Sequence, residues 1–163
     1  GYQRFDGVEP DVMTLGKALG AGAPLGAFAS KDFCSVLEPG DHGSTFGGNA
    51  LSTAAGAAAA KFIVENNVPE LASTGGAYLT AKLAQLAEKY SFISDIRGLG
   101  LLIGVEMAKE IAAPTVQECL DNGLLINAVR PNMLRFMPPL NVTEKEIDEA
   151  VQILDTSLAN TSK

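Results

Sequence analysis

Short apolar runs alternate with longer stretches of helical periodicity along this chain. An apolar run bounded by turn residues predicts a strand, and apolar residues spaced three or four apart predict the buried face of a helix. We therefore expect strands at residues 12–15, 24–30, 93–97, 101–107, 124–127 and 134–137, and helices at 49–66, 69–90, 113–122 and 144–159. The first strand is expected to be buried. Strands separated by helices indicate α/β or α+β packing.

Capping residues mark where three of these helices begin. Asn49 is an N-cap residue type that precedes an alanine-rich run, and Pro69 suits a first helical turn. Thr143 and Glu146 have the spacing of a capping box. The break between the first two helices, at residues 66–68, predicts a domain boundary.

The composition is that of a folded protein, with 47% hydrophobic and 19% charged residues among 163. Lys and Arg number 12 against 19 Asp and Glu, which gives a net charge of −7, and no basic cluster is present. This charge balance argues against nucleic acid or an anionic membrane as a partner. Cys34 and Cys119 are too few for a disulfide framework, and one His with two Cys cannot form a closed zinc site, so we expect no metal and a reducing compartment.

Lys17 follows the first predicted strand directly, within the glycine-rich and apolar segment 16–23. A lysine in that setting is expected to be partly desolvated, which favours the neutral amine that a Schiff base requires. The alternative is an ordinary lysine whose stem packs on the loop while its amine stays in water.

A second glycine-rich segment, residues 42–49, places the hydroxyls of Ser44 and Thr45 just ahead of a predicted helix. Hydroxyls and free backbone amides at a helix N-terminus can bind a phosphate or a carboxylate. The same residues could instead only cap the helix. His42 has no second His or carboxylate cluster nearby in the sequence, so we expect it to pack against the loop rather than bind a metal.

Arg135 lies inside an apolar run and is followed by two prolines. An arginine in such a strand requires an anion, either a fixed Asp or Glu or a bound carboxylate ligand. The glycines of residues 97–100 open a predicted strand pair, and they do not stand between a strand and a helix as a dinucleotide-binding fingerprint requires.

Five segments together resemble a known family, and they occur in that family's order. They are EPDVMTLGKALG at 9–20, GAPLGA at 22–27, HGSTFGGN at 42–49, RGLGL at 97–101 and LRFMPPL at 134–140. The chain resembles the C-terminal part of class III (ornithine-type, fold type I) aminotransferases that use pyridoxal phosphate. The resemblance implies an α/β fold in which residues 1–66 end a large cofactor domain with a mixed sheet, and residues 67–163 form a small α+β domain.

The resemblance also implies roles for four residues. Lys17 is expected to form the Schiff base with pyridoxal 5′-phosphate and to move the substrate proton. Thr45 is expected to contact the cofactor phosphate of the neighbouring subunit of a homodimer with shared active sites, with Ser44 near the amino-acid substrate. Arg135 matches the family arginine that holds a substrate carboxylate.

The activity implied is transfer of an amino group from N-acetylornithine, or a related ω-amino acid, to 2-oxoglutarate, as part of arginine biosynthesis in the cytoplasm or in an organelle matrix. Ornithine, succinylornithine and 4-aminobutyrate remain alternative amino donors, and a non-catalytic domain that binds an anion or a partner remains a different class of function. The chain begins with Gly1, and by resemblance several cofactor-binding residues lie upstream of it. We therefore expect a fragment that is inactive by itself.

Overall fold

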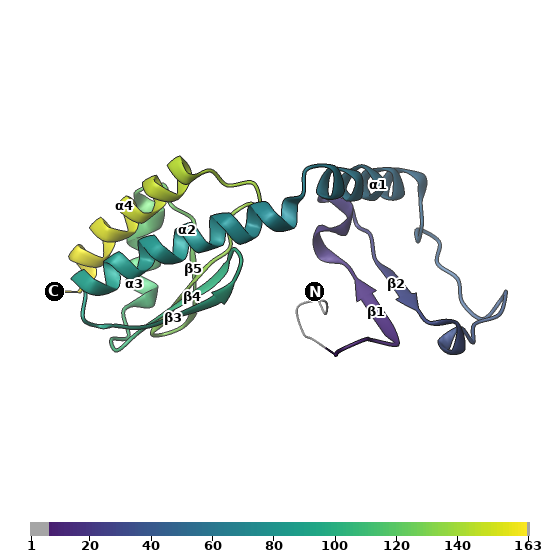
Figure 1. Ribbon diagram of the computed structural model, residues 1–163, viewed down its shortest axis with the longest axis horizontal. Helices are drawn as coiled ribbons and strands as arrows, with labels where there is room; N and C mark the ends of the chain where they lie inside the picture. The colour runs from purple at the N-terminus through teal and green to yellow at the C-terminus, as the bar shows by residue number, and fades with distance from the viewer. Residues whose placement is uncertain (1–6, 163) are drawn as a thin grey trace. The chain divides into compact units, whose positions relative to one another are not determined.

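The computed structural model describes residues 7–162, and the chain divides into two compact units, Gly1–Asn66 and Asn67–Lys163 (Figure 1). We call them the N-terminal unit and the C-terminal unit. Both combine helices with a sheet, which confirms the predicted α/β class. All strand pairs among the described residues are antiparallel.

The N-terminal unit contains one pair of strands, two short 3-10 helices and one long helix. In chain order these are β1 (Val12–Leu15), η2 (Lys17–Gly20), β2 (Ala27–Ser30), η3 (Asp32–Cys34) and α1 (Ala50–Glu65). The mixed sheet expected for this part is represented by the single pair β1–β2. The strand predicted at 24–30 begins only at Ala27, because a turn closed by the Ala23 N–H and the Gly20 carbonyl precedes it.

The prediction that residues 12–15 form a buried strand is wrong for the described structure. Every residue of β1 and β2 is exposed, and Val12 and Phe28 keep 51% and 59% of their surface. The physical reason is that a two-stranded sheet cannot bury its own side chains without a further layer. The apolar run at 12–15 thus predicted the strand correctly and its burial incorrectly.

The C-terminal unit packs three helices on a four-stranded sheet. Its elements are α2 (Val68–Lys89), β3 (Ile93–Leu99), β4 (Leu102–Met107), α3 (Ala112–Asp121), β5 (Asn127–Arg130), β6 (Met133–Phe136) and α4 (Glu144–Thr161), and the strand order is β3-β4-β6-β5. Alternate residues of β4, such as Ile103 and Val105, are buried in the core, with Leu83 and Leu154 of the helices. The intervening residue Gly104 faces the opposite side of the sheet, since strand residues alternate between faces.

The predicted helix starts are confirmed. The Asn49 side chain accepts a hydrogen bond from the Ser52 N–H at the start of α1. Thr143 and Glu146 form the complete capping box of α4, and Thr143 also lowers the pKa of the Glu146 carboxyl by donating hydrogen bonds to it from its backbone and its hydroxyl. Pro69 lies in the first turn of α2.

The strand predicted at 124–127 is displaced, because β5 begins only at Asn127. Gly123 adopts a positive φ of 90°, and the Leu124 N–H donates to the Cys119 carbonyl at 2.8 Å. Leu124 therefore completes the end of α3 instead of entering the sheet.

Gly76 and Gly100 allow the β3–β4 hairpin to lie directly against α2, and Gly98 allows its two strands to approach each other. A Cβ placed on Gly76 of α2 would lie 2.2 Å from the Gly100 carbonyl oxygen, and one on Gly98 would lie 2.1 Å from the Leu102 oxygen. Gly100 itself has a φ of +56° in the turn between the strands. The glycines of residues 97–100 thus serve backbone packing, in agreement with the predicted strand pair.

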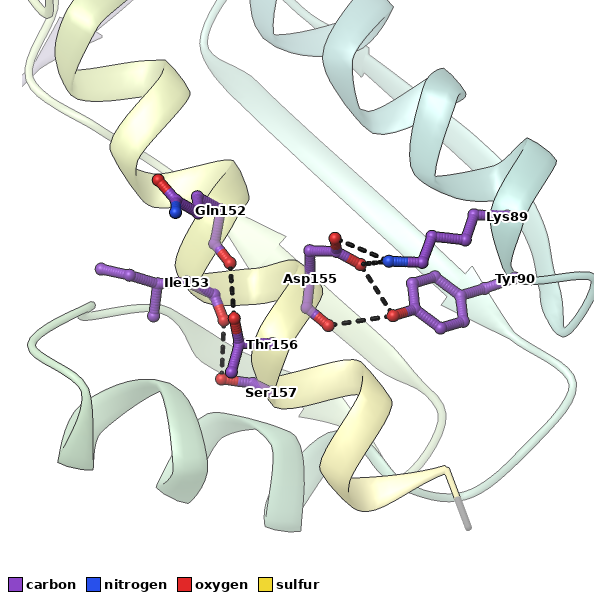
Figure 2. Close-up of polar contacts among 7 residues, drawn as sticks. All are labelled: Lys89, Tyr90, Gln152, Ile153, Asp155, Thr156 and Ser157. Atoms are coloured by element: carbon purple, nitrogen blue, oxygen red, sulfur yellow. Dashed lines mark hydrogen bonds and ion pairs between the residues drawn. The ribbon is translucent and has the colours of Figure 1, made fainter.

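A polar cluster joins the end of α2 to α4 (Figure 2). The Lys89 ammonium lies 2.7 and 2.8 Å from the two Asp155 carboxylate oxygens, and the Tyr90 hydroxyl donates to the same carboxylate at 2.7 Å. The hydrogen bond from Lys89 is the main cause that lowers the pKa of Asp155, and the bond from Tyr90 lowers it further. Burial is the main cause that raises the pKa of Tyr90. The cluster therefore ties two helices together through one ionised carboxylate.

Replacing Asp155 by Asn is expected to make the fold less stable near neutral pH. Because the folded state lowers the pKa of Asp155, its carboxylate stabilises the fold above about pH 4, and this contribution is lost as the pH falls through the folded-state value. The difference in melting temperature between wild type and Asp155→Asn should therefore be largest near pH 7 and shrink toward pH 3. Glu149→Gln, an exposed change on the same helix, is the control, and a difference that is constant with pH would contradict the prediction.

Candidate active site

Lys17 is the first residue of η2 and lies two residues after the end of β1. Its backbone has a φ of +54°, a left-handed conformation that is uncommon for residues other than glycine. Its side chain is exposed, so the partial desolvation expected from the sequence is not supplied by the described residues. The amine is accordingly open to a ligand.

Close packing against α1 holds the turn that carries Lys17. Gly56 of α1 is buried, and a Cβ at this position would lie 2.4 Å from the Leu25 Cδ2 atom and 3.3 Å from the Leu19 carbonyl oxygen. The absence of a side chain at Gly56 therefore allows η2 to approach the helix closely. Leu19, two residues beyond Lys17, transmits this restraint to the lysine.

The segment 42–49 forms an exposed loop that leads into α1. The Ser44 hydroxyl accepts a hydrogen bond from the Gly47 N–H at 2.9 Å, and Asn49 caps the helix. The capping alternative therefore holds for Asn49, the last residue of the segment, and not for the Ser44 hydroxyl, which is engaged within the loop. Among the described residues, the Thr45 hydroxyl has no hydrogen-bond partner and is available to a ligand. His42 is exposed, and the prediction that it packs against the loop is wrong because the described residues form no layer over it.

Arg135 belongs to a row of four residues that crosses the sheet of the C-terminal unit. Arg97 of β3 pairs with Gly104 of β4, Gly104 with Arg135 of β6, and Arg135 with Asn127 of β5. Residues that pair across antiparallel strands project from the same face. The two arginines therefore stand on the face opposite the helices, about 10 Å apart by the spacing of strands, with the bare backbone of Gly104 between them.

Three residues of this row, Arg97, Gly104 and Arg135, line an open groove of about 430 Å³, whose walls include Leu99, Leu102, Val129 and Met133. The two arginines in it differ in charge balance. Arg97 is paired with Asp95 and, at 2.7 Å, with Glu106, and these carboxylates raise its pKa. Arg135 is half-buried and forms no ion pair within the described residues; its Nε donates to the Asn127 side-chain oxygen at 3.2 Å. Of the two interpretations of Arg135, the geometry favours a bound carboxylate over a fixed ion pair.

Sequence reasoning missed two residues of this row, Gly104, which lines the groove, and Asn127, which contacts Arg135. Neither belongs to a motif, and only the strand register places them beside Arg135. Lys17, Ser44 and Thr45 belong to the N-terminal unit and Arg135 to the C-terminal unit. Within residues 7–162, no cluster of His, Cys, Asp and Glu has a geometry that could hold a metal ion, and no helix is long and apolar enough to cross a bilayer.

The family model described as aminotransferase class III matches residues 1–158. The chain therefore belongs to the class III aminotransferase family. It is 48% identical over 159 residues to the acetylornithine aminotransferase of Caldanaerobacter subterraneus subsp. tengcongensis. The aligned region covers 98% of this chain and 40% of that protein. It is 45% identical to the acetylornithine aminotransferase of Methanocaldococcus jannaschii, over 91% of this chain and 37% of that protein.

Solved structures of aminotransferases also match this chain. The acetylornithine aminotransferase of Elizabethkingia anophelis matches with a TM-score of 0.86 and 31% identity, over 97% of this chain and 41% of that chain. The ornithine δ-aminotransferase of Plasmodium falciparum matches with a TM-score of 0.87 and 31% identity, over 98% and 42%. The chain thus spans about two fifths of the length of its relatives.

Proposed function

We propose that this chain carries the reactive lysine of a pyridoxal-phosphate-dependent transaminase that transfers an amino group from N-acetylornithine to 2-oxoglutarate, a step of arginine biosynthesis. The observation that carries the proposal is the placement of Lys17, an exposed amine on a left-handed turn that is held against α1. The names of the similar proteins support the choice of N-acetylornithine over other ω-amino acids. Two cysteines without a disulfide suit a reducing compartment, the cytoplasm.

The residues of the N-terminal unit fit this cofactor. The Lys17 amine would hold it covalently, and the free Thr45 hydroxyl, in the loop that leads into α1, offers a donor for a phosphate oxygen of the cofactor bound by the partner subunit. When bound, pyridoxal phosphate supplies an electron sink for the carbon that loses its proton. The free Lys17 amine would accept that proton at Nζ and deliver it to the cofactor, so that one side chain acts first as base and then as acid.

Borohydride trapping tests the proposal. Pyridoxal phosphate is added to the full-length polypeptide, the complex is reduced with borohydride, and the modified peptide is identified by mass spectrometry. We expect a stable adduct on Lys17 and none on Lys61, an exposed lysine of α1. A polypeptide that forms no adduct at Lys17 would leave the non-catalytic binding domain as the better explanation.

We further propose that Arg135 binds a carboxylate of glutamate or 2-oxoglutarate. Arg135→Lys keeps the positive charge but loses the planar pair of donors. We therefore expect KM for 2-oxoglutarate to rise about 5- to 150-fold, which corresponds to a loss of roughly 1 to 3 kcal/mol of binding free energy. Steady-state kinetics and thermal unfolding check this, and the melting temperature should hardly change. A lower melting temperature with unchanged kinetic constants would instead show a structural arginine.

We also propose that the functional unit is a homodimer in which Thr45 contacts the cofactor phosphate bound by the partner subunit. The exposure of Thr45 and its free hydroxyl support this. Mixing inactive Lys17→Ala subunits with inactive Thr45→Ala subunits should restore partial activity, because one of the two sites in each hybrid dimer is intact. Hybrid dimers that form but remain inactive would show that the loop does not act across the interface.

A further inference from the structure

Asn127 and Arg135 make a direct contact that the proposed carboxylate site does not yet use. They are paired residues of neighbouring strands, and the Arg135 Nε donates to the Asn127 Oδ1 at 3.2 Å. Both side chains are half-buried on the open face of the sheet. The contact therefore restrains an arginine that otherwise has several freely rotating bonds.

The guanidinium nitrogen that contacts Asn127 determines which donors Arg135 keeps for a ligand. A guanidinium has one donor on Nε and four on its two terminal nitrogens, and a pair of parallel donors matches the two oxygens of a carboxylate. Since Asn127 occupies Nε, the terminal pair is left for a ligand. The amide oxygen of Asn127 is neutral, so it orients the guanidinium without cancelling its charge.

The neighbouring arginine shows the contrast. Arg97 lines the same groove, but the carboxylates of Asp95 and Glu106 already engage its terminal nitrogen. Gly104 between the two arginines adds no side chain to the groove. Among the described residues, Arg135 is thus the arginine of this groove that no carboxylate engages, and an amide oxygen holds it instead.

We propose that Asn127 is a positioning residue that fixes the Arg135 guanidinium so that its two terminal nitrogens bind a substrate carboxylate. This inference rests on the proposed role of Arg135. The fixed orientation reduces the conformational entropy that the arginine loses when the ligand binds, which raises affinity without a new contact to the ligand.

Direct binding of succinate tests this inference. Succinate is a dicarboxylate without an amine or a ketone, so it cannot be transaminated, and calorimetric titration of the full-length polypeptide reports binding rather than activity. Asn127→Leu removes the acceptor while keeping a side chain of similar size, and Asn127→Ala removes both. We expect each variant to weaken succinate binding about fivefold, as the loss of one typical hydrogen bond implies. KM for 2-oxoglutarate should rise equally, with kcat close to that of wild type.

The control is Asn160→Ala, which removes an asparagine that donates to Glu118 at 2.8 Å on the helical side of the unit. It should bind succinate like wild type. The decisive measurement repeats Asn127→Leu in an Arg135→Lys background, where it should have no further effect because the guanidinium that Asn127 orients is gone.

Three results would overturn the inference, and they are distinguishable. If Arg135→Lys binds succinate like wild type, the proposed carboxylate role of Arg135 fails and the inference falls with it. If Arg135→Lys weakens binding but both Asn127 variants do not, only the positioning role fails. If Asn127→Leu weakens binding equally in both backgrounds, Asn127 acts independently of Arg135.

Discussion

Lys17→Ala is expected to lower the transamination rate by several orders of magnitude. The substitution removes the amine that is proposed both to hold the cofactor and to move the substrate proton. Because one side chain would perform both roles, its loss removes both contributions to the rate. The measurement is a single-turnover assay of the full-length polypeptide with N-acetylornithine. Methylamine added to the assay should restore part of the proton-transfer rate, because it supplies the missing base from solution.

Lys61→Ala is the matched control for this prediction. Lys61 is also an exposed lysine of the N-terminal unit, and its ammonium lies 3.8 Å from Glu65 on the surface of α1. Its removal should leave the rate near that of wild type. An Lys17→Ala protein with substantial activity would contradict the proposed function.

Gly76→Ala is expected to destabilise the C-terminal unit severely. The added methyl group would lie 2.2 Å from the Gly100 oxygen and 2.4 Å from the Gly100 carbonyl carbon, and both are backbone atoms that cannot rotate away. Overpacking of this kind costs about 3 kcal/mol or more, a large fraction of the stability of a small domain. Thermal unfolding should show a melting temperature lower by about 10 °C or more, or no folded protein.

The adjacent residue provides the control, because Gly75→Ala makes the same chemical change on the same helix. A Cβ on Gly75 would lie 3.6 Å from the Leu101 Cδ2 atom, which is an ordinary contact. Since alanine favours the helix over glycine by up to about 1 kcal/mol, Gly75→Ala should be neutral or stabilising. Equal melting temperatures for the two variants would show that α2 and the hairpin can separate without cost.

Local sequence signals predicted most of the secondary structure. Asn49 and the Thr143–Glu146 pair satisfy backbone groups within a few residues of themselves, and Pro69 lacks an N–H where the first helical turn needs none. Their effect can therefore be read without knowledge of the fold. The displaced strand at 124–127 shows the limit of this approach. Leu124 is apolar and suits a strand, but the Gly123 turn assigns its N–H to the preceding helix.

The candidate site depended on longer-range information. Lys17 and Arg135 stood out because a charged residue in an apolar run is unusual, but nothing in their local sequence showed whether Arg135 has an acidic partner. Strand register bears on that question, since among the described residues it places Asn127 and Gly104, rather than a carboxylate, beside the guanidinium. The exposure of β1 also depends on distant parts of the chain, because a strand is buried only where other elements cover it. The local sequence of β1 could therefore not predict its exposure.

The left-handed backbone at Lys17 sets a local conflict between stability and chemistry. A non-glycine residue with a φ of +54° costs of order 1 kcal/mol, and glycine would occupy the same turn more easily. The position is thus filled by a residue that suits the turn poorly and offers an amine that glycine lacks. Lys17→Gly would relax this turn but would also remove the proposed reactive amine. Under the proposed function, greater stability and activity therefore place opposite demands on this position.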